Sequence, residues 1–255
     1  MTTFINIHTL ISHPSSMMNR DDSGLQKTAI FGGSTRSRIS SQCLKRAIRQ
    51  SDIYKEAVDE VSIRTNKFDE LLALCLTELP DKEPKLIEDV LLNLGSKVKK
   101  EKNKETSETK RVFDAVQPYS IGAIKEAMNM IEAGTELKAL KGIVHIPTFD
   151  VALSGRMDAS CPDRNVEAAM SVAHSLTTHS ADIEVDWFTA CDDLAEQGSG
   201  HIGTTEFSSG VFYRYASINL DLLAKNTKKT PEELSSIINT IVRCFAQVSP
   251  SAKQK

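Results

Sequence analysis

The order of strand-like and helix-like segments limits the folds open to this 255-residue chain more than any other feature. Residues 4–11, FINIHTLI, are rich in β-branched residues and partly alternate, which predicts a strand. Strand character returns in residues 142–157, GIVHIPTFDVALSGRM, where Pro147 indicates an edge or a break, and again in residues 211–220. Helical spacing fills most of the chain between these segments. This mixture favours an α+β fold of the ferredoxin-like sandwich type.

Two helices are predicted from their caps as well as from their spacing. Residues 41–51, SQCLKRAIRQS, have Ser40 and Ser41 as candidate N-caps, and their apolar side chains share one face. The last helix begins with a capping box of Thr230 and Glu233. Its expected buried stripe consists of Leu234, Ile238, Ile241, Phe245 and Val248.

The middle of the chain has a different character. Residues 52–142 show helical apolar spacing in three stretches, which predicts a helical insertion. Within it, residues 95–111, GSKVKKEKNKETSETKR, have no apolar residue besides Val98 and predict a mobile surface loop. Residues 165–179 predict a further amphipathic helix, whose inward face would hold Val166, Ala169, Met170, Ala173 and Leu176.

A block of positive charge lies near the amino terminus, although the formal net charge of the chain is −3. No acidic residue occurs between Asp22 and Asp52, and the interval holds Lys27, Arg36, Arg38, Lys45, Arg46 and Arg49. Ion pairs with phosphates supply most sequence-independent nucleic-acid affinity, and backbone N–H groups at Gly32-Gly33 and at the next helix start can add contacts. The block therefore indicates phosphate binding. The alternative interpretation is a solvated helix face with long extended side chains.

No pattern predicts a catalytic residue, a metal site or a cofactor site. The chain has no GxSxG and no P-loop motif. His174 and His179 are separated by five positions, a poor spacing for shared metal ligation on one helix face. An acidic run could form a carboxylate metal site, but a solvated acidic face is the favoured interpretation. This run consists of Asp182, Glu184, Asp186, Asp192, Asp193 and Glu196.

The pair Trp187-Phe188 lies in a Gly-flanked, loop-like segment. An exposed aromatic ring can wedge between bases or stack on them, which contributes roughly 1–3 kcal/mol per base. The alternative is a small satellite core under a long hairpin. Considered without any relative, the residues favour the satellite core.

Cysteine usage and hydropathy indicate the compartment. The five cysteines are odd in number and form no CxxC pair, and no signal peptide is evident, so a reduced cytoplasmic protein is expected. No apolar run approaches the roughly 20 residues that span a bilayer, so no membrane partner is expected.

Long runs of this sequence resemble the CasC family of backbone subunits from type I-E CRISPR Cascade surveillance complexes. The similarity is dense in the first fifty residues and from Phe149 to Leu220, and weak in the helical insertion. The matching runs, with a dot at each position that does not match, are FINIH.LISH, NRDD, QK.AIFGG, R.RISSQ.LKRA.R, D.ALSGRM, AMS.AH..TTH, DIEVDWFTA.DDL.EQGS.H.GT.EFSSGVFYRYA.INL and AKQ.

The resemblance implies a hand-shaped protein. Its palm would be a modified RNA-recognition-motif sheet built from residues 1–51, 143–181 and 209–255. Residues 52–142 would form helical fingers, and residues 182–208 an extended thumb hairpin. Family members continue past the end of this chain with a further strand and helices, so the palm is expected to be incomplete at its C-terminus.

The resemblance also implies the function. Such a subunit is not an enzyme and needs no cofactor. It binds CRISPR RNA without regard to sequence, and copies of it polymerise along the guide in a helical filament with other Cascade subunits. Each thumb displaces one guide nucleotide, and the other nucleotides stay ready to pair with target DNA.

Residues matching the family's motifs inherit the expected roles. Guide RNA contacts are expected from Arg20, Lys27, Arg38, Ser40, Gln42, Lys45, Arg46, Arg49, Met157, Phe188 and Thr189. Met157 would pack against guide bases, and Phe188 and Thr189 would pry out the nucleotide, which reverses the satellite-core interpretation. Lys138 and Lys141 are candidates for DNA contact.

Two alternatives from other functional classes stay open. Relatives of this backbone in other CRISPR types cut target RNA with a thumb-base aspartate and a divalent metal. Asp186 or Asp192 would be the candidate in a metal-dependent RNA endonuclease of that kind. The second alternative is an RNA-recognition module that acts as a monomer.

Overall fold

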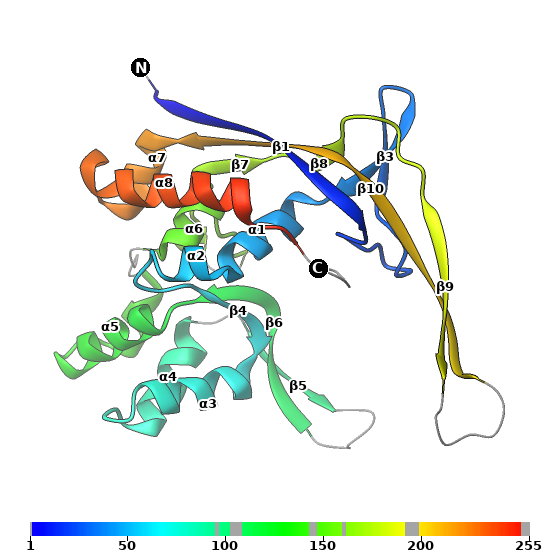
Figure 1. Ribbon diagram of the computed structural model, residues 1–255. Helices are drawn as coiled ribbons and strands as arrows, with labels where there is room; N and C mark the ends of the chain where they lie inside the picture. Colours follow the sequence, from blue (N-terminus) through cyan, green and yellow to red (C-terminus); the bar gives the residue numbers. More distant parts are fainter. Residues whose placement is uncertain are drawn as a thin grey trace. The chain divides into compact units, whose positions relative to one another are not determined.

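The computed structural model describes residues 2–94, 97–102, 109–142, 147–159, 162–191 and 199–250 of the chain. The chain divides into two compact units (Figure 1). The first unit comprises Met1–Thr3, Val58–Met170 and Asn219–Leu234. The second unit comprises Phe4–Ala57, Ser171–Ile218 and Ser235–Lys255.

An antiparallel sheet organises the second unit. Its strands are β1 (Phe4–Ser16), β2 (Thr28–Phe31), β3 (Ser34–Ile39), β7 (Met170–Val172), β8 (Ser175–Thr177), β9 (Glu184–Cys191) and β10 (Ser199–Asn219). The order across the sheet is β1-β10-β8-β3-β2, and β7 and β9 also pair with β10. The long strand β10 therefore connects most of the sheet.

Helices cover one face of this sheet. They are α1 (Ser41–Gln50), α2 (Asp52–Lys55) and the larger part of α8 (Pro231–Gln247). Leu44 of α1 packs in a buried cluster with Ile39 and Phe212. Arg214 of β10 is only 1% exposed, and its Nη1 donates to the carbonyl oxygen of Val248 at 2.7 Å, just beyond α8. Alternate residues of β10 thus point inward beneath α1 and α8.

A smaller sheet and several helices form the first unit. Its strands β4 (Ile63–Lys67), β5 (Val98–Lys102) and β6 (Thr109–Tyr119) have the order β4-β6-β5. Its helices are α3 (Phe68–Glu78), α4 (Pro84–Leu94), α5 (Ile121–Glu132), α6 (Phe149–Ser154) and α7 (Leu220–Thr227), with 3₁₀ helices η1 (Leu137–Gly142) and η2 (Pro162–Arg164). Phe68, Phe113 and Ile124 are among the residues that fill one core cluster, so α3, β6 and α5 share it.

The expectation of a purely helical segment at 52–142 is corrected by β4, β5 and β6. The surface loop predicted at 95–111 is likewise wrong where the structure describes it, because β5 and β6 pair antiparallel there, with Lys100 opposite Arg111. Backbone pairing stabilises this hairpin, while the described side chains between Lys99 and Lys110 are all exposed and, apart from Thr109, charged. No alternation of apolar residues was therefore present to reveal it.

The strand predicted at 142–157 is wrong in its central part, and residues 143–146 lie outside the described ranges. Phe149–Ser154 is helix α6, where the carbonyl oxygen of Thr148 accepts from the N–H groups of Val151 and Ala152 at 3.0 and 2.9 Å. Gly155 has a φ of +80° and ends the helix. Six residues are too few to show a helical period in the sequence.

The amphipathic helix predicted at 165–179 is also wrong. The segment contains β7 and β8, and β8 pairs with both β10 and β3. Ala169 and Met170 are buried as expected, but Ala173 is exposed. Pairing with distant strands decides the structure here and overrides the local helical spacing.

Other expectations are confirmed. The strand predicted at 4–11 is part of β1, and the strand predicted at 211–220 is part of β10 except for Leu220, which begins α7; both strands are longer than expected. Helix α1 and the capping box of α8 are present, with the N–H of Thr230 donating to Glu233 Oε2 at 2.7 Å. The antiparallel sheets with helices agree with the α+β class. The ferredoxin-like detail stays a prediction.

Candidate nucleic-acid interface

The β2–β3 hairpin positions the first part of the basic block. Gly32 and Gly33 have φ values of +62° and +75°, which suits a two-residue type I′ turn between twisted strands. The resulting register places Lys27 and Arg38 side by side, and the N–H of Arg38 donates to the carbonyl oxygen of Lys27 at 2.8 Å. The hairpin thus brings together two of the predicted RNA contacts.

The start of α1 is held by side chains of its own unit. The N–H of Ser40 donates to Asn19 Oδ1 at 2.9 Å, and Ser40 Oγ accepts from the N–H of Cys43 at 3.2 Å. Ser41 donates its N–H to His174 Nδ1 at 2.9 Å. The N–H groups of Ser40, Ser41 and Cys43 are therefore already engaged, and the helix start offers fewer N–H groups to a phosphate than the sequence predicted.

Helix α1 has three faces. Leu44 and Ile48 are buried in the core. A second face carries Gln42, Lys45 and Arg49, of which Gln42 is exposed and the two basic residues are half-buried. The third face carries Cys43, Arg46, Ala47 and Gln50, which line a pocket of about 730 Å³ with the end of β1 and the segment after α8. Of the three basic residues of α1, Arg46 lines this pocket, whereas Lys45 and Arg49 are not among its lining residues.

The thiol of Cys43 lies near two residues of the basic block. Burial raises the pKa of its thiol, and the positive charges of Arg46 and Lys27 act in the opposite direction. Cys43 therefore lies within electrostatic reach of Arg46 on α1 and of Lys27 before β2.

Arg20 belongs to a short loop before β2. It is exposed, and an antiparallel bridge to Gln26 closes the loop. Asp21 Oδ1 accepts from the N–H groups of Ser23 and Leu25, each at 2.9 Å. The carboxylate of Asp21 thus stabilises the loop through backbone N–H groups, while the Arg20 side chain is exposed at the surface.

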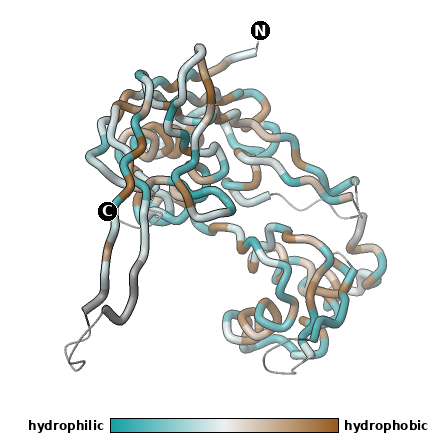
Figure 2. The backbone as a smooth tube through the Cα atoms, turned by 90° about the vertical axis from the view of Figure 1, so that its right-hand side faces the viewer, coloured by the Kyte–Doolittle hydropathy of each residue, from teal (hydrophilic) through white to brown (hydrophobic). Residues whose placement is uncertain are grey.

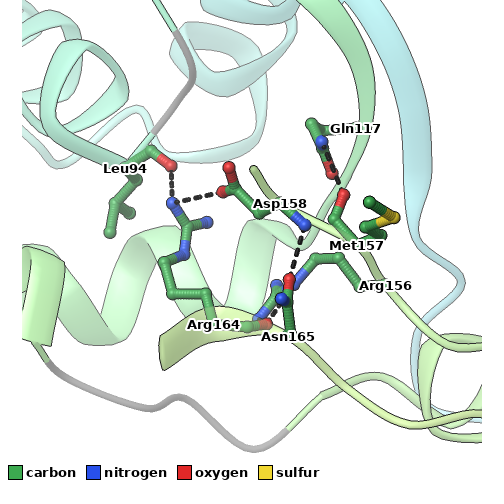
Figure 3. Close-up of polar contacts among 7 residues, drawn as sticks. All are labelled: Leu94, Gln117, Arg156, Met157, Asp158, Arg164 and Asn165. Carbon is green, nitrogen blue, oxygen red and sulfur yellow. Dashed lines mark hydrogen bonds and ion pairs between the residues drawn. The ribbon is translucent and has the colours of Figure 1, made fainter. Parts of the chain in front are cut away.

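Met157 belongs to the first unit and is 81% exposed. Its carbonyl oxygen accepts from Gln117 Nε2 at 3.0 Å (Figure 3). Its neighbour Arg156 donates through Nε and Nη2 to the carbonyl oxygen of Arg164, at 2.8 and 2.6 Å. The backbone on this side of Met157 is therefore fixed although the thioether is at the surface.

The segment after Met157 is fixed in the same way. The N–H of Asp158 donates to Asn165 Oδ1 at 2.5 Å, and the Asp158 carboxylate pairs with Arg164 at 3.6 Å. Arg164 also donates to the carbonyl oxygen of Leu94 (Figure 3). An exposed apolar side chain on a braced backbone is well suited to contact a flat ligand.

Strands β9 and β10 form the hairpin predicted at 182–208, and they run side by side in Figures 1 and 2. Phe188 pairs with Gly203, and a Cβ atom at Gly203 would lie only 2.5 Å from Phe188 Cζ. Thr189 is exposed, whereas Phe188 is half-buried against its own hairpin. Trp187 is 72% exposed, so the more accessible aromatic residue is the one to which the family resemblance gave no role.

The remaining predicted residues lie in the first unit. Lys138 is exposed on η1. Lys141 is on the same 3₁₀ helix, and its side chain, like Asp192, lies outside the described residues. The predicted contacts are thus divided, since the basic block, Phe188 and Thr189 belong to the second unit, and Met157 belongs to the first.

Metal-ligating side chains do not cluster in the described part of the chain, which holds no group of three or more His, Cys, Asp or Glu residues placed to bind one ion. Within the same ranges, every helix is too short or too polar to cross a membrane.

Fold and interface together describe an α+β protein with antiparallel sheets and a cationic candidate interface. A family model described as "CT1975-like protein" matches residues 5–255, and the chain belongs to this family.

Chains of several solved structures are similar to this chain, and two of them illustrate the likeness. A chain of a "CRISPR RNA-guided surveillance complex, pre-nicking" is 31% identical with a TM-score of 0.77, over 98% of this chain and 74% of that one. A chain of a "CRISPR RNA-guided surveillance complex" is 27% identical with a TM-score of 0.54, over 98% of this chain and 63% of that one. This chain thus spans less than two thirds of the second neighbour. No curated protein matches the chain.

Proposed function

We propose that this protein is a non-catalytic backbone subunit of the CasC type in a type I-E Cascade complex. In this role it binds CRISPR RNA independently of sequence, polymerises along the guide with other Cascade subunits, and presents the guide for pairing with target DNA. The site of action is the cytoplasm.

The cationic region of the second unit carries the proposal. Lys27 and Arg38 adjoin across the β2–β3 hairpin, and Lys27 and Arg46 act on the same thiol. Positive groups in such an arrangement neutralise phosphates and release counterions, whatever bases the strand carries. The similarity to chains of RNA-guided surveillance complexes supports a CRISPR-associated role and supplies the class of nucleic acid.

Sequence independence is a physical requirement for such a subunit. Copies that occupy successive stretches of one guide meet different bases at each position. Phosphate contacts and apolar contacts do not read base edges, so the same residues serve every copy. Met157, Phe188 and Thr189 are the side chains proposed for the contacts that do not involve phosphates.

The proposal is tested by measuring RNA affinity over a salt series for the wild type and for the double variant Lys45→Ala/Arg49→Ala. Each phosphate contact on a single strand contributes about 0.7 to the slope of log K against log salt. The variant is therefore expected to bind more weakly at low salt, with a slope smaller by about 1.4.

A matched control removes two positive charges elsewhere. Lys99 and Lys100 are exposed on β5 of the first unit, and the variant Lys99→Ala/Lys100→Ala has the same net charge as the test variant. This control is expected to keep the wild-type slope. Equal slopes for the wild type and the Lys45→Ala/Arg49→Ala variant would overturn the phosphate-binding role.

A further inference from the structure

The face of the second unit's sheet opposite α1 and α8 carries a row of side chains that the basic block does not include. In β10, β8 and β3, Tyr213 pairs with Leu176, and Leu176 pairs with Arg38. Residues directly opposite each other in paired strands project from the same face. The row therefore leads from a tyrosine through a leucine to an arginine, and Lys27 adjoins its basic end.

Strand β1 adds further rings at the other end of the row. His8 Nδ1 lies 2.7 Å from Tyr213 Oη. The His8 ring centroid is 4.9 Å from that of Tyr215, with the planes inclined by 41°. Tyr215 in turn donates its hydroxyl to Asn6 Oδ1 at 3.1 Å. Three rings from two adjacent strands thus form one aromatic cluster.

The cluster lies at the surface. Along β10, Phe212, Arg214 and Ala216 are buried, whereas Tyr213 between them is 41% exposed. His8 is exposed as well, and Tyr215 is half-buried. The alternation shows that the core holds one set of side chains and leaves the aromatic set on the outer face.

The charge on this face favours an anionic ligand. Its outward positions are the even-numbered residues 4–14 of β1, Leu176 of β8, Arg36 and Arg38 of β3, and the odd-numbered residues 209–219 of β10, and none of them is Asp or Glu. An interface for a protein or an uncharged ligand does not require basic residues beside a patch of rings. Single-stranded nucleic acid combines flat bases with a charged backbone and matches both features.

We propose that His8, Tyr213 and Tyr215 form a platform on which unpaired bases of single-stranded RNA stack, while Lys27 and Arg38 neutralise the neighbouring phosphates. The inference deepens the proposed function, because it gives the guide a base-contacting surface that the resemblance does not assign. Stacking is tolerant of sequence, since every base has a π-face. The platform therefore meets the same requirement as the phosphate contacts.

The test compares a fluorescent single-stranded RNA with an abasic oligonucleotide of the same length. The double variant Tyr213→Ala/Tyr215→Ala is expected to bind the RNA roughly tenfold to a hundredfold more weakly, with an unchanged salt slope, because stacking releases no counterions. Its affinity for the abasic strand is expected to equal that of the wild type. The ring-retaining variant Tyr213→Phe/Tyr215→Phe is expected to rescue RNA binding, and melting curves check that each variant is folded.

A second measurement does not depend on the variants. RNA that contains 4-thiouridine is cross-linked to the wild type by light, and the labelled peptide is expected to contain Tyr213 and Tyr215. Undiminished RNA binding by the folded alanine variant, with cross-links elsewhere, would overturn the platform. Loss of self-association in that variant, with RNA binding intact, would also overturn it and assign the face to protein contacts.

The two proposals fail in different ways. If the platform alone is wrong, the Lys45→Ala/Arg49→Ala variant still shows its reduced salt slope. If the proposed function is wrong, the wild type shows no salt-dependent RNA binding at all, and RNA and abasic strands behave alike.

Discussion

At the scale of single residues, the least usual environment belongs to Arg214. Its guanidinium makes no ion pair with a carboxylate in the described part of the chain, and burial lowers its pKa to about 10. Its bonds go instead to the carbonyl oxygens of Phe245 and Val248 at 3.3 and 2.7 Å. Those oxygens lie at the carboxyl end of α8, where the helix dipole favours a positive charge.

His13 shares this environment, which makes the stability of the second unit depend on pH. Its Nε2 lies 3.2 Å from Arg214 Nη2, and burial, followed by the charge of Arg214, lowers the pKa of His13 below 6.5. The unfolded chain then binds more protons below about pH 6.5. We expect the free energy of unfolding to be highest above that pH and to fall as the pH decreases through the lowered pKa.

Urea unfolding, measured roughly one pH unit above and below the ordinary histidine value, checks this expectation. The variant His13→Gln cannot take up the proton, yet its amide oxygen can still accept from Arg214. It is expected to lose part of the acid sensitivity. The same pH dependence in the variant and the wild type would assign the effect to other groups.

At the scale of elements, the β2–β3 turn determines the register that joins Lys27 to Arg38. Gly33 has a φ of +75°, and no atom lies within 4 Å of a Cβ built there. A side chain at this position would therefore meet no steric clash with its surroundings, and its cost would come from the backbone conformation alone. We expect Gly33→Val to destabilise the second unit by about 1–2 kcal/mol, because a β-branched residue is disfavoured in this region. Thermal unfolding measures the change.

Asparagine at the same position is the matched control. Asn enters the left-handed region much more readily than Val, so Gly33→Asn is expected to lose only a small part of the stability. Equal melting temperatures for the Val and Asn variants would show that the turn conformation does not limit the hairpin.

Elements with local signals were predictable from the sequence, and elements with distant partners were not. Ser40 and the Thr230–Glu233 box are caps whose bonds close within one helical turn, and both helices are present. Strands β7 and β8 depend on pairing with β10, some forty residues away. The local spacing of apolar residues therefore predicted a helix where the strands lie. In the hairpin of β5 and β6, the described residues between Lys99 and Lys110 are all polar and offer no apolar pattern.

The candidate site follows the same division. The basic block is contiguous in sequence, so its residues were found, but only the structure shows that Arg46 lines the pocket beside α1 and that Lys45 and Arg49 do not. The aromatic cluster of His8 and Tyr215 unites strands about two hundred residues apart, and no spacing rule reveals it.

At the scale of the whole molecule, we expect assembly to depend on RNA length. A filament subunit adds copies of 28.1 kDa to a longer strand, because each copy covers a stretch of phosphates and leaves the rest available. Light scattering with RNAs of increasing length is therefore expected to show stepwise increases in mass. The RNA recovered after incubation with Mg²⁺ is expected to be intact.

This experiment separates the open alternatives. One copy per RNA at every length would indicate a monomeric recognition module. Periodic cuts in the RNA would indicate an endonuclease, with Asp186 the described candidate on β9.

Gly203 has a consequence for any attempt to reshape the β9–β10 hairpin. The Phe188 ring occupies the volume that a methyl group at position 203 would need, with only 2.5 Å between the two. Even Gly203→Ala would therefore force the Phe188 ring to move. The absence of a side chain at Gly203 on β10 therefore determines the orientation of the Phe188 ring on the paired strand β9.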